Sequence, residues 1–460
     1  MSFYSTISPD IINRYNVVGP RYTSYPTVPI WENGDFGGTY EDFLKREGQN
    51  PAPFSLYIHL PFCSRLCTFC GCNQFITNNK TLPEQYLDSI DAELERTSQL
   101  MGTRKTIKQL HLGGGTPTHL SVDQLQRLMA MIEKRFDVDR TGEIALEAHP
   151  RVTTDEQLTA LRELGFGRIS FGVQDLDPDV QKAINRNQTL EMTQRTFEKS
   201  RELGFESINI DLVYGLPKQT VATFERTMEL VHEMGPDRMA IYSFAYIPNM
   251  FKGHERAIKT TDLPSAEEKV EIYLSSIRFF TEHDYRMIGM DHYARLGDEM
   301  ATSQADGTLH RNFMGYTTLK GLSQIGMGVS AISDFGDGYF QHDKDLHSYM
   351  KRVNEGDLAV IRRMQLNKDD VLRRELIESL MCQCRVDFNA LGKKHDIDYE
   401  SYFANEIGAM ATFVEEGLVT YAGGVLELTE LGVLFMRNVA MPFDRYLADR
   451  SRKFNFSKTV

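Results

Sequence analysis

The stretch Cys63-Ser-Arg-Leu-Cys67-Thr-Phe-Cys70-Gly-Cys72 holds four of the six cysteines in a chain of 460 residues. Three thiolates spaced by three and then two residues can surround one metal centre on a single tight loop. Soft sulfur ligands favour iron–sulfur clusters, zinc or copper(I). The concentration of cysteines therefore predicts a metal centre on this loop.

A zinc site and a disulfide are the alternatives to an iron–sulfur cluster. Structural zinc normally takes its remaining ligands from a second pair of Cys or His residues. The other cysteines, Cys382 and Cys384, lie far along the chain, with one residue between them and no His pair beside them. A disulfide is disfavoured in a reducing cytosol. A [4Fe–4S] cube held by three cysteines fits better, and it leaves one iron free to bind a substrate or cofactor.

The composition is that of an ordinary globular enzyme. Hydrophobic residues make up 41% and charged residues 25% of the chain, and its length allows a large domain with one or two smaller ones. The N-terminus has neither a basic start nor an apolar run, and no stretch approaches about eighteen apolar residues, so we expect a cytoplasmic protein without a signal peptide or membrane span. The net charge of −13 argues against nucleic-acid binding. An anionic substrate would need a local basic lining.

Apolar segments alternate with amphipathic helical segments along most of the chain. The expected strands are 55–60, 107–112, 143–148, 168–173, 207–213, 238–243 and 285–290, and the expected helices are 82–101, 121–136, 154–164, 189–203 and 220–234. Gly165, Gly204 and Gly235 stand where helices end. This rhythm is typical of parallel βαβ units. It predicts an α/β fold with a partial, (β/α)6-like, TIM-like barrel whose chemistry lies at the carboxyl ends of the strands.

Glycines and polar residues gather at those strand ends. The second strand runs into Gly113-Gly-Gly-Thr-Pro117, where absent side chains let the backbone approach a ligand, although a tight turn would explain the glycines equally well. Glu147 lies on the third strand, Gln174 ends the fourth, Asp211 lies on the fifth, and the sixth leads to Ala245. Each could be a satisfied structural group. Their shared location predicts a site.

The cysteine spacing, with Phe69 before Cys70, resembles the radical S-adenosylmethionine (SAM) superfamily. Longer strings narrow the resemblance: Arg21-Tyr-Thr-Ser-Tyr-Pro26, Tyr57-Ile-His-Leu-Pro-Phe-Cys63, Cys70-Gly-Cys-Asn73, Gly113-Gly-Gly-Thr-Pro-Thr118, Phe171-Gly-Val-Gln-Asp175, Ile210-Asp-Leu-Val-Tyr-Gly-Leu-Pro217, Gly289-Met-Asp-His292 and Gly326-Met-Gly-Val-Ser-Ala-Ile332. Together they resemble the oxygen-independent coproporphyrinogen III oxidases (dehydrogenases) of bacterial haem biosynthesis, nearly from end to end. The chain departs from that pattern at Met314, where Gln is usual, and at Tyr293, where Phe is usual.

The resemblance implies one [4Fe–4S] cluster and two SAM molecules. Cys63, Cys67 and Cys70 would ligate the cluster. The first SAM, chelating the open iron, would lie among Tyr57, Gly114, Glu147 and Ile332, and the second among Phe69, Gly115, Thr116, Gln174, Arg186, Asp211 and Ala245. Taken alone, Arg186 would be interpreted as a surface charge, but its guanidinium suits the methionyl carboxylate. Asp211 suits a ribose hydroxyl.

The resemblance also implies the reaction. A 5′-deoxyadenosyl radical from reductive cleavage of SAM would remove a hydrogen from the β-carbon of a propionate, and loss of carbon dioxide and an electron would leave a vinyl group. Two such steps would convert coproporphyrinogen III into protoporphyrinogen IX. We expect a monomer that receives its electron from a donor such as flavodoxin or ferredoxin and has no nucleic-acid partner.

Two further residues are assigned to catalysis by the same resemblance. Arg21 on the N-terminal arm is the leading contact for the substrate carboxylates, with Tyr22 and Tyr25 as partners; a strap closing the bottom of the barrel is the alternative. Cys72 would assist near the cluster without ligating it, and an incidental small residue is the alternative. A haem chaperone of the same superfold is the rival function, but those chaperones lack the arm segment and Cys72. A non-catalytic iron–sulfur module would not need the residues of the second SAM site.

The last hundred residues show a different pattern. Helices are expected at 366–384, 388–394 and 399–416, followed by a two-stranded hairpin over 417–429 that turns at Gly423-Gly424. This arrangement is winged-helix-like, but residues 365–460 carry twelve Lys and Arg against fifteen Asp and Glu, the wrong sign for DNA. We therefore interpret it as a lid or support. The expected divisions are an arm (1–50), a radical SAM barrel (51–300), a completing and connecting segment (301–364) and a smaller, mainly helical C-terminal domain (365–460).

Overall fold

A computed structural model describes residues 9–103, 105–247, 257–447 and 456–459. Its centre is a thirteen-stranded sheet in the order β1-β17-β16-β15-β14-β2-β5-β6-β7-β8-β9-β11-β10. Neighbouring strands from β14 to β9 all run parallel. They are β14 (Ser323–Met327), β2 (Phe54–Leu60), β5 (Thr106–Gly114), β6 (Asp137–Ala148), β7 (Arg168–Gln174), β8 (Ser207–Tyr214) and β9 (Arg238–Ser243). The run from β2 to β9 confirms the six parallel strands expected from the sequence.

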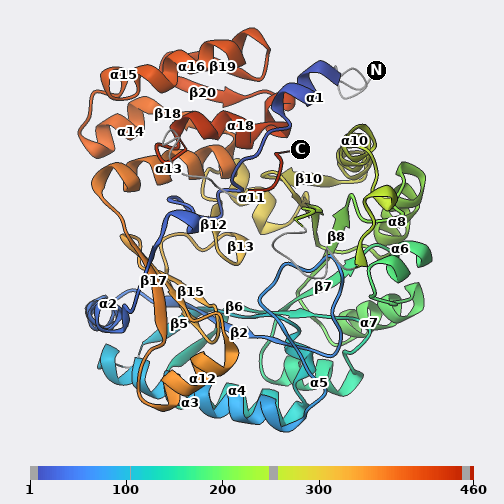
Figure 1. Cartoon of the computed structure of the whole chain (residues 1–460), viewed down its shortest axis with the longest axis vertical. Coiled ribbons are helices and arrows are strands. Elements are labelled where there is room, and N and C mark those ends of the chain that lie inside the picture. Colours follow the sequence, from blue (N-terminus) through green and yellow to red (C-terminus); the bar gives the residue numbers. More distant parts are fainter. Residues whose placement is uncertain (1–8, 104, 248–256, 448–455, 460) are drawn as a thin grey trace.

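Helices connect the parallel strands and cover the outer side of the curved sheet (Figure 1). They are α3 (Thr81–Met101), α4 (Val122–Glu133), α5 (Asp155–Glu163), α6 (Pro178–Ala183), α7 (Leu190–Glu202), α8 (Val221–Met234) and α10 (Ala266–Glu282). The side chains of Ser121, Thr154 and Thr220 cap the first turns of α4, α5 and α8 in reciprocal capping boxes. Gly235 ends α8 in the left-handed region at φ 69°. The predicted helices are thus confirmed, with local reasons for their bounds.

The barrel is partial because the parallel run is flanked by antiparallel strands. Beyond β14 lie β15 (Ile332–Asp334), β16 (Gly338–His342), β17 (Val360–Gln365) and β1 (Glu32–Asn33), and beyond β9 lie β11 (His292–Arg295) and β10 (Tyr285–Ile288). The strand expected at 285–290 is therefore not a further parallel unit: it forms an antiparallel hairpin with β11. Strand β14 was not predicted, since it is short and contains Gly326, where a Cβ would lie 2.3 Å from the Ile332 carbonyl oxygen.

The C-terminal domain lies across one end of the barrel (orange to red in Figure 1). It contains α13 (Lys368–Gln383), α14 (Phe388–His395), α15 (Tyr399–Tyr402), α16 (Ala404–Glu415), α17 (Glu430–Leu434) and α18 (Met436–Ala440), with β18 (Arg385–Asp387), β19 (Val419–Ala422) and β20 (Val425–Leu428). The predicted hairpin is confirmed, and Gly423 and Gly424 take positive φ at its turn. Two details differ from the prediction. Strand β18 pairs with β20, so the hairpin becomes a three-stranded sheet. The helix expected at 399–416 is broken at the fully buried Phe403.

The N-terminal arm is held by the C-terminal domain. Tyr15 ends helix α1 (Pro9–Tyr15), and it is buried in that domain's hydrophobic core together with Tyr22 and Tyr25 of the segment that follows. Arg437 of α18 donates hydrogen bonds to the carbonyls of Gly19 and Pro20. In contrast, α2 (Gly37–Gln49), also within the expected arm, packs against α3 of the barrel.

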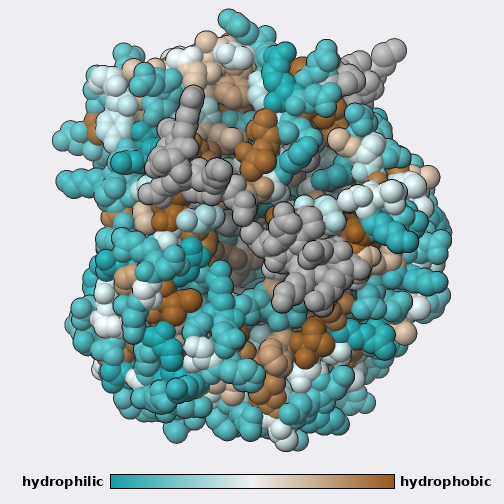
Figure 2. All heavy atoms as spheres, in the orientation of Figure 1, coloured by the Kyte–Doolittle hydropathy of each residue, from teal (hydrophilic) through white to brown (hydrophobic). Residues whose placement is uncertain are grey.

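The molecular surface gives no sign of a membrane span. No helix in the described part of the chain is long and apolar enough to cross a bilayer. The face in Figure 2 is mostly hydrophilic, and its hydrophobic side chains occur in small groups.

The remaining helices and strands complete the connections: α11 (Glu299–Ala305), α12 (Leu346–Asn354), β3 (Phe62–Cys63), β4 (Phe75–Ile76), β12 (His310–Asn312) and β13 (Gly315–Thr317).

Candidate active site

A cavity at the carboxyl ends of the parallel strands brings together most of the predicted site residues. The cysteine loop follows β2 and forms one wall. Among the lining residues are Cys63, Cys67, Phe69, Cys70, Cys72, Gly114, Gly115, Thr116, Glu147, Gln174, Arg186 and Asp211. These residues come from five successive strands and the loops after them, which is where chemistry is located in β/α barrels.

The three expected cluster ligands share this cavity, and burial governs their acidity. The Cys63 Sγ lies 3.4 Å from the Thr116 Oγ1, and burial raises the pKa of Cys63 to about 11. The Cys67 Sγ accepts a hydrogen bond from Arg186 Nη1 at 3.5 Å. Among the described residues, no three His, Cys, Asp or Glu side chains are placed to hold a single metal ion. Three thiols on one loop are the ligand type that iron–sulfur clusters use.

Cys72 differs from its neighbours on the loop. A hydrogen bond from its thiol stabilises the Cys70 thiolate and lowers the pKa of Cys70, and the same contact raises the pKa of Cys72. Cys72 is accessible because it borders the cavity. A protonated thiol therefore faces the space beside the candidate cluster loop.

Glu147 presents an ionised carboxylate to the cavity. Its Oε2 accepts a hydrogen bond from the Gly114 N–H at 3.1 Å, and its Oε1 lies 3.6 Å from His111 Nε2. Burial alone would raise the pKa of Glu147, but His111 and the Gly114 amide outweigh burial and lower it. A Cβ at Gly115 would lie 2.5 Å from the Pro61 carbonyl. The glycine triplet thus serves both as a tight turn and as a wall of the site.

Asp211 lies deeper in the same cavity. Its two carboxylate oxygens accept hydrogen bonds from Ser170 Oγ at 2.9 Å and from Asn209 Nδ2 at 2.8 Å. Burial raises its pKa to about 6, and the charge of Glu147 adds to the increase. Ser170 and Asn209 therefore fix the direction of a carboxyl group that can change its charge near neutral pH.

Arg186 is buried rather than at the surface. Its guanidinium donates to the Gly172 carbonyl and to the Cys67 sulfur. The resemblance implied that Arg186 binds the methionyl carboxylate of the second SAM. The structure adds a contact between Arg186 and Cys67, a candidate cluster ligand. The surface-charge interpretation of Arg186 is wrong.

Three predicted SAM residues do not line the cavity. Tyr57 lies behind Gly113, where a Cβ would come within 3.0 Å of its ring, and its hydroxyl lies 3.1 Å from His59 Nδ1. Ile332 begins β15 and packs against the hydrophobic cluster around Trp31. Ala245 follows β9, just before residues 248–256, which lie outside the described part of the chain.

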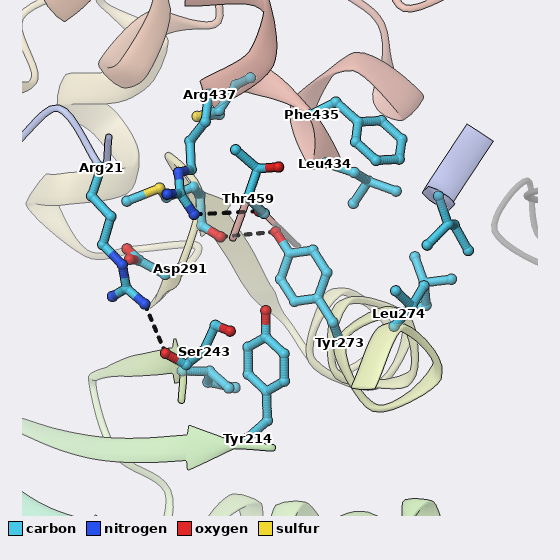
Figure 3. A pocket seen from close by; sticks show the side chains of 15 residues that line it. Arg21, Tyr214, Ser243, Tyr273, Leu274, Asp291, Leu434, Phe435, Arg437 and Thr459 are labelled. Carbon is cyan, nitrogen blue, oxygen red and sulfur yellow. Dashed lines mark hydrogen bonds between the residues drawn. The ribbon is translucent and has the colours of Figure 1, made fainter. Parts of the chain in front are cut away.

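Arg21 lies in a neighbouring cavity between the arm and the C-terminal domain (Figure 3). Its Nη2 donates to the carbonyl of Ser243, the last residue of β9, at 2.7 Å. The arm therefore crosses the carboxyl ends of the strands and not the bottom of the barrel. Tyr22 and Tyr25, expected as substrate partners, are instead 5% and 2% exposed within the C-terminal core, so that expectation was wrong.

Sequence reasoning missed several residues at this end of the barrel. Tyr242 and His149 line the cluster cavity, and burial, followed by the charges of Arg186 and Arg151, lowers the pKa of His149 to about 2. The His292 Nδ1 lies 2.6 Å from Asp291 Oδ1. Their positions in the sequence could have revealed His149 and Tyr242. His149 directly follows the end of β6, and Tyr242 lies in β9 between Ile241 and Ser243, which line the other cavity.

The two departures from the family pattern lie in different surroundings. Tyr293 is 1% exposed and packs against Phe280 in the main core. Met314 lies in the turn between β12 and β13, where its N–H donates to Asn312 Oδ1 at 2.9 Å. The first departure is therefore a matter of core packing.

Comparisons with known proteins cover nearly the whole chain. Residues 57–231 match the radical SAM superfamily, and residues 366–435 match the HemN C-terminal domain. The oxygen-independent coproporphyrinogen III oxidases of Salmonella typhimurium and Escherichia coli are each 42% identical, with 98% of both chains covered, and that of Pseudomonas aeruginosa is 40% identical over 98% of both. The solved structure of coproporphyrinogen III oxidase (HemN) from Escherichia coli, described as a radical SAM enzyme, superposes with a TM-score of 0.89 at 41% identity, covering 93% of this chain and 97% of that one.

Proposed function

The chain belongs to the family of oxygen-independent coproporphyrinogen III oxidases, and we propose that it decarboxylates two propionate side chains of coproporphyrinogen III oxidatively to give protoporphyrinogen IX. The observation that carries this function is the cavity in which a three-cysteine loop faces Glu147 and Asp211, in a chain similar to these enzymes from end to end. The enzyme is an oxidoreductase that uses a [4Fe–4S] cluster and SAM.

Cys63, Cys67 and Cys70 are the proposed ligands of the cluster. They lie on one loop, face one cavity and leave room for a fourth, non-protein ligand. When bound, the cluster and SAM supply the one-electron cleavage that yields a 5′-deoxyadenosyl radical. Arg186, beside the Cys67 sulfur, stabilises thiolate charge on the ligand that it touches.

The other residues of the cavity orient the cofactors. The ionised Glu147 suits the ammonium group of the first SAM, and the Gly114 amide holds that carboxylate in place. Asp211, fixed by Ser170 and Asn209, suits the ribose hydroxyls of a second SAM. Cys72 offers a protonated thiol next to the reacting space, where it can deliver or hold a proton. Arg21, in the neighbouring cavity, contacts the substrate's carboxylates.

The haem chaperone remains the alternative function. Its support is the shared cluster motif. Against it stand the arm, which reaches the strand ends through Arg21 and Ser243, and the fourth thiol, Cys72, at the cavity wall. A chaperone would bind haem and leave porphyrinogen unchanged.

We further propose that the protein acts as a monomer and takes its electron from a small redox protein such as flavodoxin or ferredoxin. We propose that the chain divides into residues 1–50, 51–300, 301–364 and 365–460. Helix α2 belongs to the first segment but packs against α3 of the barrel. The C-terminal domain supports the arm across the substrate side.

An anaerobic product assay tests the function. The reconstituted protein, SAM, a reductant and coproporphyrinogen III should yield a divinyl porphyrinogen together with methionine and 5′-deoxyadenosine. The Cys63→Ser variant is the matched control and should yield none of these products. Tight haem binding by the wild-type protein without decarboxylation would favour the chaperone and overturn the proposal.

A further inference from the structure

A second cavity lies between the N-terminal arm, α10 and the C-terminal domain (Figure 3). Its volume is about 50 Å³. The polar lining includes Arg21 of the arm, Tyr214 and Ser243 at the ends of β8 and β9, and Arg437 of α18. Ile12, Val270, Leu274, Leu434 and Phe435 supply apolar walls. This cavity suits an ionised group attached to an apolar body.

Positive charge gathers around the cavity. Arg21 and Arg437 line it, and the Lys269 Nζ lies 5.8 Å from the centre of the Tyr214 ring in its wall. Within the described chain, these three cations donate to backbone carbonyls, such as those of Ser243, Phe244 and Pro20, and make no ion pair with a carboxylate. Asp291 also lines the cavity, where its Oδ1 lies 2.6 Å from His292 Nδ1, and the charges of His292, Arg311 and Arg21 outweigh burial and lower the pKa of Asp291. One carboxylate therefore stands against three cations.

The crowding of cations has an energetic consequence. Burial and the charge of Arg21 lower the pKa of Lys269 to about 8 and that of Arg437 to about 10. Three buried cations with one carboxylate among them are costly, and a further anion in the cavity would offset that cost. The chain carries a net charge of −13, so this positive region runs against the overall field.

The cavity is separate from the cluster site but shares the same strand ends. Tyr214 and Ser243 face it, whereas Val213 and Tyr242, their neighbours in the two strands, line the cluster cavity. Side chains alternate between the two faces of a strand. A group bound here lies on the other face of the strands from the cluster cavity, and one ligand lying over the strand ends can reach both cavities.

We propose that this cavity receives a propionate carboxylate of the porphyrinogen other than the reacting one, held by Arg21 and Arg437 and attracted by the charge of Lys269 behind the Tyr214 wall. The inference rests on the proposed function, which supplies a substrate with four carboxylates. A volume of about 50 Å³ admits a carboxylate but no tetrapyrrole ring, since a single water needs roughly 10 to 15 Å³. Binding a remote carboxylate orients the reacting propionate toward the cluster cavity.

Charge removal at Lys269 tests the proposal. Lys269→Met keeps the length of the side chain, and loss of one of the three positive charges around the cavity should weaken binding about tenfold. The readouts are the KM for coproporphyrinogen III and the Kd of the holoenzyme for coproporphyrin III by fluorescence. Lys199→Met on α7, which removes a half-buried lysine paired with Glu202, is the control. In Lys199→Met, both readouts, uncoupled SAM cleavage and the cluster spectrum should remain as in the wild type.

A second variant and a second probe keep the test decisive. Val270→Phe on α10 fills the cavity with apolar bulk. It should keep or raise the melting temperature of the protein and weaken the binding of coproporphyrin III. The tetramethyl ester of coproporphyrin III lacks the carboxylates and should bind the wild type more weakly than the acid. Equal affinity of ester and acid, or wild-type KM in a well-folded Lys269→Met protein, would overturn the proposal.

The same measurements separate this inference from the proposed function. A wild type that binds coproporphyrin III through Lys269 yet forms no vinyl product would contradict the function and support the cavity. Vinyl formation with a KM unaffected by Lys269→Met and Val270→Phe would support the function and remove the cavity from substrate binding.

Discussion

Cys72 and the three cysteines before it share one loop but not one environment. Cys72 donates a hydrogen bond to Cys70 and keeps its own proton. We expect Cys72→Ser to retain about four irons per chain and the absorbance of the cluster, while product formation falls at least tenfold. Cys63→Ser should lose the cluster. Iron analysis after anaerobic reconstitution checks both, and a colourless Cys72→Ser protein would make Cys72 a ligand.

Asp211 offers a test of the second SAM site. We expect Asp211→Ala to lower product formation about ten- to a hundredfold, because one charged hydrogen-bonding group is lost, and high SAM should partly restore the rate. The change that SAM causes in the cluster's EPR spectrum should persist, since it reports the first SAM. Asp42→Ala on α2, which removes an exposed carboxylate, is the control. Loss of the spectral change would place Asp211 at the first site.

The titration of Asp211 also affects stability. Its pKa is about 6 in the fold against about 3.9 in an unfolded chain, so the folded state binds this proton more tightly. The resulting stabilisation is complete below the unfolded pKa and is lost as the pH rises through 6, amounting to at most about 3 kcal/mol. Urea unfolding of the cluster-free protein at pH 4 and 6.5 tests this. Between these two pH values the free energy of unfolding should fall less in Asp211→Asn than in the wild type. An equal loss in both proteins would contradict the raised pKa.

Single residues were predictable where the chemistry is local. Glu147, Gln174 and Asp211 were assigned to a site because each lies at a strand end, and a parallel sheet brings those ends together. Tyr22 and Tyr25 were misassigned because their burial depends on the C-terminal domain, more than three hundred residues away in sequence. The second cavity, here called the positive cavity, was missed for the same reason, since Arg21 and Arg437 that line it are far apart in the sequence.

At the scale of elements, the arm depends on hydrogen bonds to its backbone. Asn438 of α18 is buried, and its Nδ2 donates to the Tyr15 carbonyl at 2.9 Å. Asn438→Ala should lower the free energy of unfolding by about 1 to 3 kcal/mol and loosen the arm. Faster hydrogen exchange in residues 9–26, with the β5 region unchanged, would show this effect. Unchanged exchange in the arm would mean that other contacts hold it.

Strong periodicity explains which elements were predictable. The strands from β2 to β9 and the helices between them carry apolar repeats and capping residues, so their bounds agree closely with the structure. Strand β14 lacks such a repeat, and β10 carries nothing in its sequence that reveals its antiparallel partner β11. Likewise, the break at Phe403 follows from tertiary packing, which overrides a continuous helical pattern.

At the scale of the whole molecule, the C-terminal domain, the arm and the strand ends enclose the substrate side. Arg21 joins the arm to β9, and Arg437 joins the C-terminal domain to the arm. The cluster cavity and the positive cavity open on two faces of the same strands. A substrate that is held in the second cavity and reacts at the cluster end must therefore span both cavities.

Isotope transfer tests the central claim most directly. Coproporphyrinogen III deuterated at the propionate β-carbons is incubated anaerobically with the reconstituted protein, SAM and a reductant, and 5′-deoxyadenosine is analysed by mass spectrometry. The account predicts deuterium in 5′-deoxyadenosine in proportion to the vinyl groups formed. Vinyl groups formed without deuterium in 5′-deoxyadenosine, or 5′-deoxyadenosine formed without any change in the porphyrinogen, would contradict it.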